Sequence, residues 1–290
     1  MKAVLCRDWG GPESLTVEEV AAPAPGPDQV LIEVAAANVA GLREGQRVMA
    51  LTDWGGYAEM AVARAGDVYP IPDSLGWAEA AGFPITYGTA HGALRWHADL
   101  QPGEVLLVHG AAGGVGLAAV EIGKALGATV IATAGGAEKL AVAKAHGADH
   151  LIDYRSEDIR ARVKELTAGK GADVVFDPVG GDVFDASLRC IAWSGRLLVI
   201  GFAAGRVPQV PANILLVKNI AVMGVYWGSY RKHAPERLVE EFRELFGWYE
   251  AGLLKPHVSH RLALAAAGEA MALLLQRRST GKVVLITGAL

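Results

Sequence analysis

The chain has 290 residues, 52% of them hydrophobic, which is enough to bury one large core or two modest ones, and its length favours two domains. A formal net charge of −4 gives no general attraction to nucleic acid or to an anionic membrane surface. The two cysteines, Cys6 and Cys190, are too few for a disulfide framework or a zinc cluster and indicate the reducing cytosol. Since we recognise neither a secretory signal nor an 18-residue apolar span, we expect a cytoplasmic protein without a membrane partner.

The first 85 residues predict short strands separated by turns. The expected strands are 2–6, 30–38, 46–51 and 55–63, with a Pro/Gly-rich connector at 21–29. An amphipathic helix is expected over 234–252, and residues 258–286 predict a strand, a helix and a closing strand. Because this tail lacks any further strand–helix alternation, we expect it to return to the first domain.

From about Gly103 the pattern changes to apolar strands that alternate with helices. The strands are expected at 104–110, 129–134, 150–154, 172–180, 195–202 and 220–227, and the helices at 115–127, 137–147, 156–168 and 182–191. Such alternation is typical of a parallel, doubly wound α/β sheet of the Rossmann type.

A glycine-rich turn joins the first of these strands to the first helix. It reads Gly110-Ala111-Ala112-Gly113-Gly114-Val115-Gly116. In this position, backbone N–H groups at the positive end of the helix suit a pyrophosphate, and Gly116 allows the helix to pack closely on the sheet. The turn therefore predicts dinucleotide binding, and the alternative is a sharp turn with small residues chosen for packing.

The end of the next strand bears on which dinucleotide binds. Sites selective for NAD place an acid there on the adenosine ribose, whereas this chain has Gly135 and Gly136. A carboxylate would repel a 2′-phosphate, so its absence favours NADPH over NADH, with Lys139 as a counter-charge. The alternative for Lys139 is an ordinary solvated helix lysine.

Residues 105–154, from VLLVHGAAGGVG to HLIDY, closely resemble the quinone oxidoreductases, the zinc-free branch of the medium-chain dehydrogenase/reductase superfamily. The resemblance continues through FDPVGGDVF, GRLLVIGFAAG, LLVKNIAVMGVYWGSY and the terminal TGKVVLI. It implies a GroES-like β-barrel catalytic domain built from residues 1–87 and 229–290, around a Rossmann domain of residues 88–228. It also implies NADPH in the cleft between these domains.

The resemblance implies cofactor contacts but no catalytic residue. Tyr154 joins Lys139 at the 2′-phosphate, while Asn38 and Tyr226 lie by the nicotinamide. The full set, carried over by position, is Asn38, Thr89, Gly110, Ala111, Gly113, Gly114, Val115, Gly116, Lys139, Tyr154, Gly201, Phe202, Tyr226, Trp227, Gly281 and Lys282. Alternatively, Tyr154 and Phe202 are core aromatics at strand ends, and Asn38 is a turn residue.

The chain departs from the family pattern after Asn38. It passes almost directly to Gly41–Val48, so several dozen residues that the family has here are absent. The loss shortens the barrel and removes one wall of the substrate cleft. A natural short form, an engineered deletion and an omitted segment all remain open explanations.

The expected activity is hydride transfer from NADPH to a quinone or another conjugated carbonyl acceptor. Reduction of 2-alkenals or enoyl thioesters is the alternative reaction, and NADPH binding without efficient turnover is the alternative outside enzymes. No metal is expected, because the chain has no ligand cluster suited to zinc. The apolar strand 220–227 lies at a sheet edge and predicts a homodimer.

Overall fold

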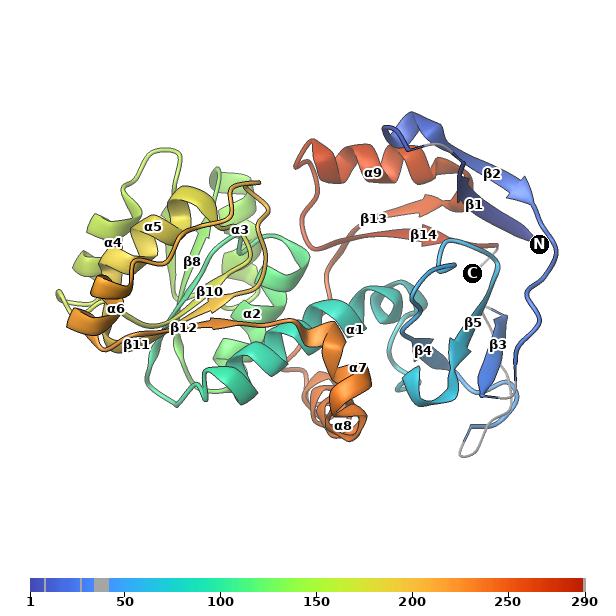
Figure 1. Ribbon diagram of the computed structural model, residues 1–290, viewed down its shortest axis with the longest axis horizontal. Coiled ribbons are helices and arrows are strands. Elements are labelled where there is room, and N and C mark those ends of the chain that lie inside the picture. Colours follow the sequence, from blue (N-terminus) through green and yellow to red (C-terminus); the bar gives the residue numbers. More distant parts are fainter. Residues whose placement is uncertain (8, 27, 34–41, 289–290) are drawn as a thin grey trace. The chain divides into compact units, whose positions relative to one another are not determined.

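The computed structural model describes residues 1–7, 9–26, 28–33 and 42–288, and it divides the chain into two compact units (Figure 1). One unit combines residues 1–84 with 257–290, and the other comprises residues 85–256. Both ends of the chain thus belong to the unit that encloses the other in sequence, as the family resemblance implies. Asn38 lies outside the described residues.

The second unit is built on a six-stranded sheet in the order β12-β11-β10-β7-β8-β9. All neighbouring strands are parallel, which confirms the predicted doubly wound sheet. Every residue of β10 is buried, as expected when helices cover both faces of a parallel sheet. The strands are β7 Val105–Val108, β8 Thr129–Ala134, β9 His150–Asp153, β10 Ala172–Asp177, β11 Ile191–Val199 and β12 Ala221–Gly224.

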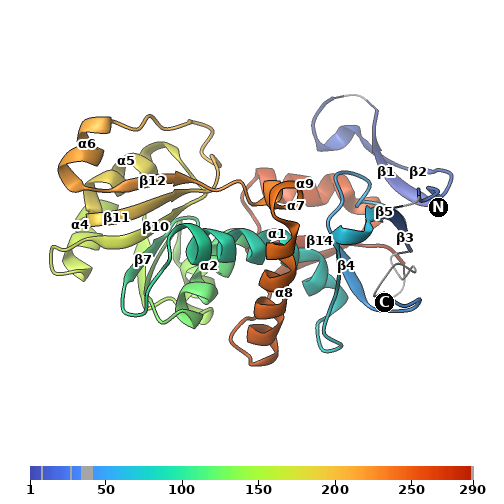
Figure 2. The same cartoon turned by 60° about the horizontal axis from the view of Figure 1, so that its bottom comes forward.

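Most helices of the second unit lie on the two faces of this sheet, as Figures 1 and 2 show. Right-handed crossovers place α2 and α3 on one face, and the next two helices pack together on the other. Among the described residues, no helix is both long and apolar enough to cross a bilayer. The helices are α2 Gly114–Ala125, α3 Ala137–Ala145, α4 Ile159–Leu166, α5 Gly181–Cys190, α6 Ala212–Lys218, α7 Tyr230–His233 and α8 Pro235–Glu250.

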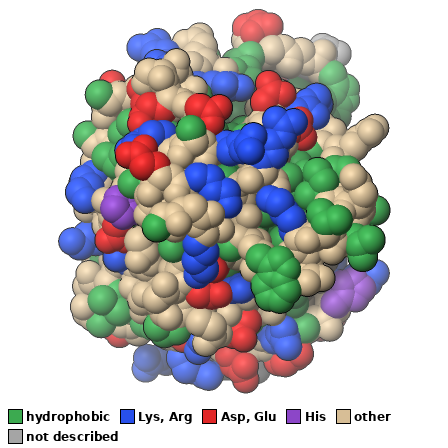
Figure 3. Space-filling view, turned by 90° about the vertical axis from the view of Figure 1, so that its left-hand side faces the viewer, with side chains coloured by type: hydrophobic (Ala, Val, Ile, Leu, Met, Phe, Trp, Pro, Cys, Tyr) green, Lys and Arg blue, Asp and Glu red, His purple; other side chains and the backbone are tan. Residues whose placement is uncertain are grey.

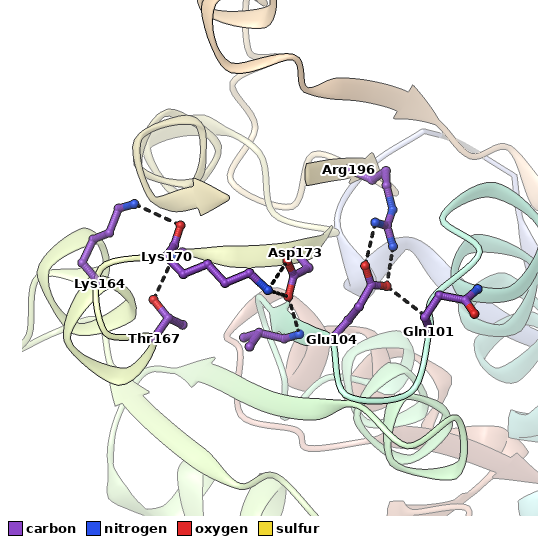
Figure 4. A network of polar contacts seen from close by, with 9 residues as sticks. Gln101, Glu104, Lys164, Thr167, Lys170, Asp173 and Arg196 are labelled. Carbon is purple, nitrogen blue, oxygen red and sulfur yellow. Dashed lines mark hydrogen bonds and ion pairs between the residues drawn. The ribbon is translucent and has the colours of Figure 1, made fainter. Parts of the chain in front are cut away.

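Polar side chains fasten the amino-terminal edge of the sheet (Figure 4). Asp173 accepts hydrogen bonds from the Val105 backbone N–H at 2.9 Å and from Lys170 Nζ at 2.9 Å. Arg196 on β11 donates two hydrogen bonds to Glu104, at 2.8 and 2.6 Å. These contacts join β7, β10 and β11 at one edge and leave the carboxyl edge of the sheet to the glycine-rich turns.

Helix α1, Trp77–His91, was not predicted, since the sequence up to residue 85 suggested strands. It contains Pro84 and two glycines, Gly82 and Gly88, and most of its residues are buried, so no apolar stripe distinguishes it. The helix continues into a π-helical turn over Gly92–His97. Helix α6 was also missed, and β11 begins four residues before the expected strand.

The described residues of the first unit form short strand pairs, the first half of α1 and a further helix near the carboxyl terminus. The pairs β1–β2, β3–β5 and β4–β6 are antiparallel, as in a small GroES-like domain, and β13–β14 is parallel. One small core cluster in this unit buries Val30, Ala63 and Val68. The elements are β1 Lys2–Cys6, β2 Leu15–Glu19, β3 Gln29–Glu33, β4 Val48–Ala50, β5 Met60–Arg64, β6 Val68–Pro70, β13 Val258–Ala263, α9 Ala267–Leu275 and β14 Lys282–Ile286.

The boundary near residue 229 differs from the expected one, because residues 229–256 belong to the second unit. Helix α8 buries Leu238, Phe242 and Leu245 there. Its Glu241 also forms hydrogen bonds with His91 and Trp227 of the same unit. These apolar and polar contacts explain why the amphipathic helix does not separate with the tail that follows it.

Candidate cofactor-binding site

The turn between β7 and α2 is held in a shape that requires glycine. Gly110 has φ +57°, a left-handed conformation that glycine adopts at little cost. A Cβ atom on Gly116 would lie 2.8 Å from the Ala111 Cα and closer still to the Gly110 carbonyl oxygen. The Ala111 N–H donates to the Thr133 carbonyl at 3.0 Å and so ties the turn to β8. The first turn of α2 therefore lies directly against the loop backbone.

The amino end of α2 offers backbone donors without a competing side chain. Gly113 is the N-cap, no side-chain hydrogen bond caps this helix, and its first turn carries no acidic residue. The first N–H groups of a helix have no acceptor within the helix, and the helix dipole makes this end positive. This is the environment in which helices bind phosphate groups.

A buried histidine lies directly before the glycine-rich turn and contacts two neighbouring elements. His109 is fully buried, with Nδ1 2.9 Å from the Thr133 hydroxyl and Nε2 2.7 Å from the Ser187 hydroxyl. Burial lowers the pKa of His109, so a neutral ring joins β7 to β8 and α5. No sequence motif points to a role for this histidine, because its partners lie 24 and 78 residues away.

Basic and phenolic groups gather where β8 ends. A Cβ on Gly135 would lie 2.7 Å from the Tyr154 hydroxyl and 2.9 Å from Arg155 Nε, so both side chains lie over this glycine. Lys139 stands in the first turn of α3 and is half-buried. Arg155 was missed, although it directly follows Tyr154 at the carboxyl end of β9, the strand next to β8.

Asp153 is the last residue of β9 and directly precedes Tyr154 and Arg155, but one of its carboxylate oxygens binds backbone groups. Its Oδ1 accepts from the Gly136 N–H at 3.1 Å and from the Arg155 N–H at 3.0 Å. Gly136 has φ +96°, which favours glycine at the start of α3. Asp153 thus shapes the turn that presents Lys139, Tyr154 and Arg155.

The predicted residues beyond β11 lie close to the turn that follows β10. A Cβ on Gly201 would lie 3.3 Å from the Pro178 carbonyl oxygen, and one on Gly180 would lie 3.3 Å from the Phe202 ring. Phe202 is 43% exposed. Since a Cβ on Gly110 would likewise lie 3.3 Å from Val179, three turns at the carboxyl edge of the sheet are in contact.

Tyr226 and Trp227 follow β12 and differ sharply in exposure. Tyr226 is 80% exposed, whereas Trp227 is 2% exposed and its indole lies against Gly88 and Gly92. Thr89, on the same helix as Gly88, is half-buried. The Trp227 side chain is thus a packing group, and Tyr226 is the aromatic of this pair that a ligand can reach.

Gly281 and Lys282 belong to the first unit. Gly281 has φ +58°, and a Cβ there would lie 2.6 Å from His257 Cδ2. The Lys282 N–H donates to the His257 carbonyl at 3.0 Å, and burial lowers the pKa of its ammonium group. Among the described residues, no group of three or more His, Cys, Asp or Glu side chains is placed to hold a metal ion.

Comparison with known proteins gives this geometry a family. A model described as "Zinc-binding dehydrogenase" matches residues 114–246. A "Quinone oxidoreductase-like protein 2 homolog" of Nematostella vectensis is 45% identical over 253 residues, covering 86% of this chain and 69% of the relative. The chain belongs to the quinone oxidoreductases. A Pseudomonas aeruginosa "Quinone oxidoreductase" is 38% identical, covering 88% of this chain and 79% of its own length.

Solved structures place the chain in the zinc-free branch of the medium-chain dehydrogenase/reductase superfamily. The Escherichia coli quinone oxidoreductase, solved as a complex with NADPH, matches with a TM-score of 0.91 at 29% identity, covering 99% of this chain and 100% of that one. The alignment with human quinone oxidoreductase is 330 residues long and spans 98% of that protein. Since this chain has 290 residues, the alignment must contain gaps in this chain. Such gaps are expected from the predicted loss of residues after Asn38.

Proposed function

We propose that the protein is a zinc-independent, NADPH-dependent oxidoreductase that reduces a quinone or a related conjugated carbonyl compound. The observation that carries the proposal is the pair of anion sites on consecutive strands of the second unit. One lies at the amino end of α2, and the other is the group of Lys139, Tyr154 and Arg155 at the end of β8. The complex of the E. coli relative with NADPH supports this choice of cofactor.

The first anion site fits a pyrophosphate. Gly116 has no Cβ, so the first turn of α2 can lie against the loop backbone, with which any side chain at this position would collide. The donors are the N–H groups of Gly114, Val115 and Gly116 in the first turn of α2, and Gly110, Ala111 and Gly113 shape the loop that precedes them. The buried His109 keeps this loop in register with β8.

The second site fits a 2′-phosphate. A guanidinium, an ammonium and a phenol meet a dianion with charge-assisted hydrogen bonds, which are stronger than neutral ones. The carboxylate of Asp153 accepts from the Gly136 and Arg155 backbone. We assign Lys139, Tyr154 and Arg155 to the discrimination of NADPH from NADH.

Exposed aromatics suit the nicotinamide end of the cofactor. We assign Phe202, Tyr226 and the half-buried Thr89 of the second unit to this role. The roles of Asn38, Gly281 and Lys282 stay predictions from the family resemblance. When bound, the reduced nicotinamide supplies a hydride. The residues of the chain orient the reactants and exclude water. We assign no proton donor, since reduction of a quinone to a hydroquinonate needs little acid catalysis.

Steady-state oxidation of NADPH with a panel of quinones, 2-alkenals and enoyl thioesters tests the proposal. We expect the protein to oxidise NADPH with quinones as acceptors, and a metal chelator should not change the rate. Preference for an alkenal or thioester would instead support the alternative reductase. Tight NADPH binding without turnover of any acceptor would indicate a binding protein. With one exposed and one buried cysteine, neither in a disulfide, we place the activity in the cytosol.

We also propose that the second unit mediates a homodimer. Strand β12 lies at the end of the sheet order, and an edge strand has unpaired backbone groups that can bind another strand. The preceding helix α6 exposes Leu216 and Val217, and Figure 3 shows hydrophobic side chains on the end of the unit that carries α4 and α6. Light scattering at micromolar concentration should give twice the 30.4 kDa chain mass. A monomer would contradict the dimer.

A further inference from the structure

A buried histidine lies between two carboxylates where α1 meets α8. His91 is 1% exposed. Its Nδ1 is 3.0 Å from Glu241 Oε1, and its Nε2 is 2.8 Å from Glu244 Oε2. Both ring nitrogens therefore face carboxylate oxygens, and neither faces a hydroxyl or backbone group. Neither Glu241 nor Glu244 belongs to the proposed cofactor-binding site.

This arrangement holds one more proton than a neutral histidine with two carboxylates. A neutral imidazole has one N–H and one lone pair, and a lone pair facing a carboxylate oxygen is repulsive. When both glutamates are ionised, two hydrogen bonds to them require both ring nitrogens to donate, which makes His91 an imidazolium. A buried cation of this kind is stable only with its partners in place.

The same cluster holds Trp227. Glu241 uses its second oxygen, Oε2, to accept from the Trp227 indole N–H at 2.8 Å. The indole lies in a slot formed by two glycines four residues apart: a Cβ on Gly88 would lie 2.6 Å from its Cε2, and one on Gly92 would lie 3.2 Å from its Cδ1. Glu241 therefore connects the charge on His91 to the position of the Trp227 ring.

Trp227 in turn limits where Tyr226 can lie. Val225 is bonded through its N–H to the Val199 carbonyl at the end of β11, at 3.0 Å. The Tyr226 carbonyl accepts from the Ser229 hydroxyl at 2.7 Å. Tyr226 is thus held from both sides by anchored neighbours while its own ring is exposed.

We propose that His91 is a positioning residue for the reduction, which as an imidazolium holds Glu241, and through it Trp227, so that Tyr226 is fixed beside the reactants. The proposal rests on the proposed function for its effect on turnover. Its structural part, the charge of His91 and the position of Tyr226, does not depend on any activity.

The other charged and aromatic groups around His91 come from the turn after α1 and from α7 and α8. From the π-helical turn after α1, Arg95 lies 3.7 Å from Glu244, and the Trp96 ring stands edge-on to His91. From α8, the Trp248 ring lies 5.6 Å from the His91 ring, and Arg237 lies over Trp96. His97 bonds with Tyr230 of α7 at 3.0 Å, and its pKa is lowered by burial and by Arg237. Burial raises the pKa of Glu241, and His91 and Trp227 oppose this rise.

The kinetic test compares His91→Gln and Trp227→Phe with His97→Gln as the control. Glutamine cannot replace both ring N–H donors of an imidazolium, and phenylalanine keeps an aromatic ring but has no indole N–H. For the first two variants we expect kcat to fall about tenfold while the Kd for NADPH stays within about twofold, as for a loss of orientation. An unchanged kcat, or an equal loss of kcat and NADPH binding, would overturn the proposal.

Two NMR measurements need no turnover and keep the proposal testable if no acceptor is reduced. Side-chain ¹⁵N spectra, with His91 assigned by its loss in His91→Gln, should show both ring nitrogens protonated at neutral pH. In protein labelled with fluorotyrosine, the Tyr226 signal, assigned with Tyr226→Phe, should move in His91→Gln and not in His97→Gln. A neutral His91, or a Tyr226 signal that does not respond, would refute it.

Discussion

The two units of the chain are built differently. In the second unit, short turns at the end of one six-stranded sheet carry the proposed phosphate sites, and buried polar groups such as His109 fix these turns. Among its described residues, the first unit has four separate two-stranded sheets, and its Trp9 and Trp54 are 101% and 84% exposed. The proposed phosphate contacts therefore come from one stretch of the chain, whereas the first unit is assembled from strands of both chain ends.

Gly116→Ala should give the largest effect, and it falls in the second unit. The added Cβ would meet the Ala111 and Gly110 backbone, which cannot give way as a flexible side chain would. We expect NADPH binding to weaken more than tenfold, measured by titration of cofactor fluorescence. Gly247→Ala in α8 is the control: its Cβ meets open space, so it should stabilise the helix by about 0.5–1 kcal/mol and leave binding intact. Normal binding by Gly116→Ala would contradict the proposed pyrophosphate site.

Glu121→Ala should give the next largest effect. This buried carboxylate of α2 accepts from the Tyr87 hydroxyl at 2.6 Å and from the Lys255 N–H at 3.0 Å, and lies 2.5 Å from His146 Nδ1. Burial beside Glu121 raises the pKa of Tyr87, which remains a donor. Removing the carboxylate takes away the shared acceptor of these contacts at a buried position, so the free energy of unfolding should fall by about 3 kcal/mol.

The control for this change is Glu121→Gln, which keeps an acceptor for Tyr87 and Lys255. In urea unfolding, Glu121→Gln should lower the free energy of unfolding by less than half of the loss expected for Glu121→Ala. Tyr87 and Lys255 lie within three residues of the two places where the chain passes between units, so Glu121 ties both passages to α2. If the free energy of unfolding falls equally in the two variants, the carboxylate does not contribute through its charge.

Lys139→Ala and Arg155→Ala test the second anion site. Each should weaken NADPH binding by about 1–2 kcal/mol and leave NADH binding nearly unchanged, because only NADPH carries the 2′-phosphate. Arg162→Ala is a basic control elsewhere in the unit, where Arg162 pairs with Glu157 and Glu165. If either site variant weakens both cofactors alike, its side chain does not recognise the phosphate.

The two cysteines offer a milder test, one in each unit. Cys190 is buried, which raises the pKa of its thiol to about 11, whereas Cys6 is exposed. A thiol reagent at pH 8 should modify one cysteine in the native protein and both in urea. Because the pKa of Cys190 is raised, its contribution to stability is complete below its ordinary pKa of 9 and is lost as the pH rises through 11. Rapid native labelling of Cys190 would contradict the packing of α5 against β11.

The sequence predicted the second unit well because its signals are local. Strand β8 and the start of α3 appear at the expected residues, and the glycine turn has the expected place between β7 and α2. Helix α1 was missed, because Gly82, Pro84 and Gly88 are poor helix formers and because most of the helix is buried, which leaves no apolar stripe to recognise. Tertiary packing, which the sequence pattern does not display, forms that helix.

Part of the site was likewise beyond the sequence. Arg155 was overlooked because its relation to Gly135 depends on the pairing of β8 with β9. The side chain of Trp227 proved to be buried, because Gly88 and Gly92, far away in the chain, form a slot for it. The partners His91 and Glu241 are 150 residues apart, so no motif signals their contact.

Titration of the wild-type protein with NADPH and with NADH tests the central claim most directly. The groups at the end of β8 predict that NADPH binds at least tenfold more tightly, about 1.4 kcal/mol or more, and that raising the salt concentration narrows the difference. Equal dissociation constants, or tighter binding of NADH, would contradict the assignment of this site to a 2′-phosphate.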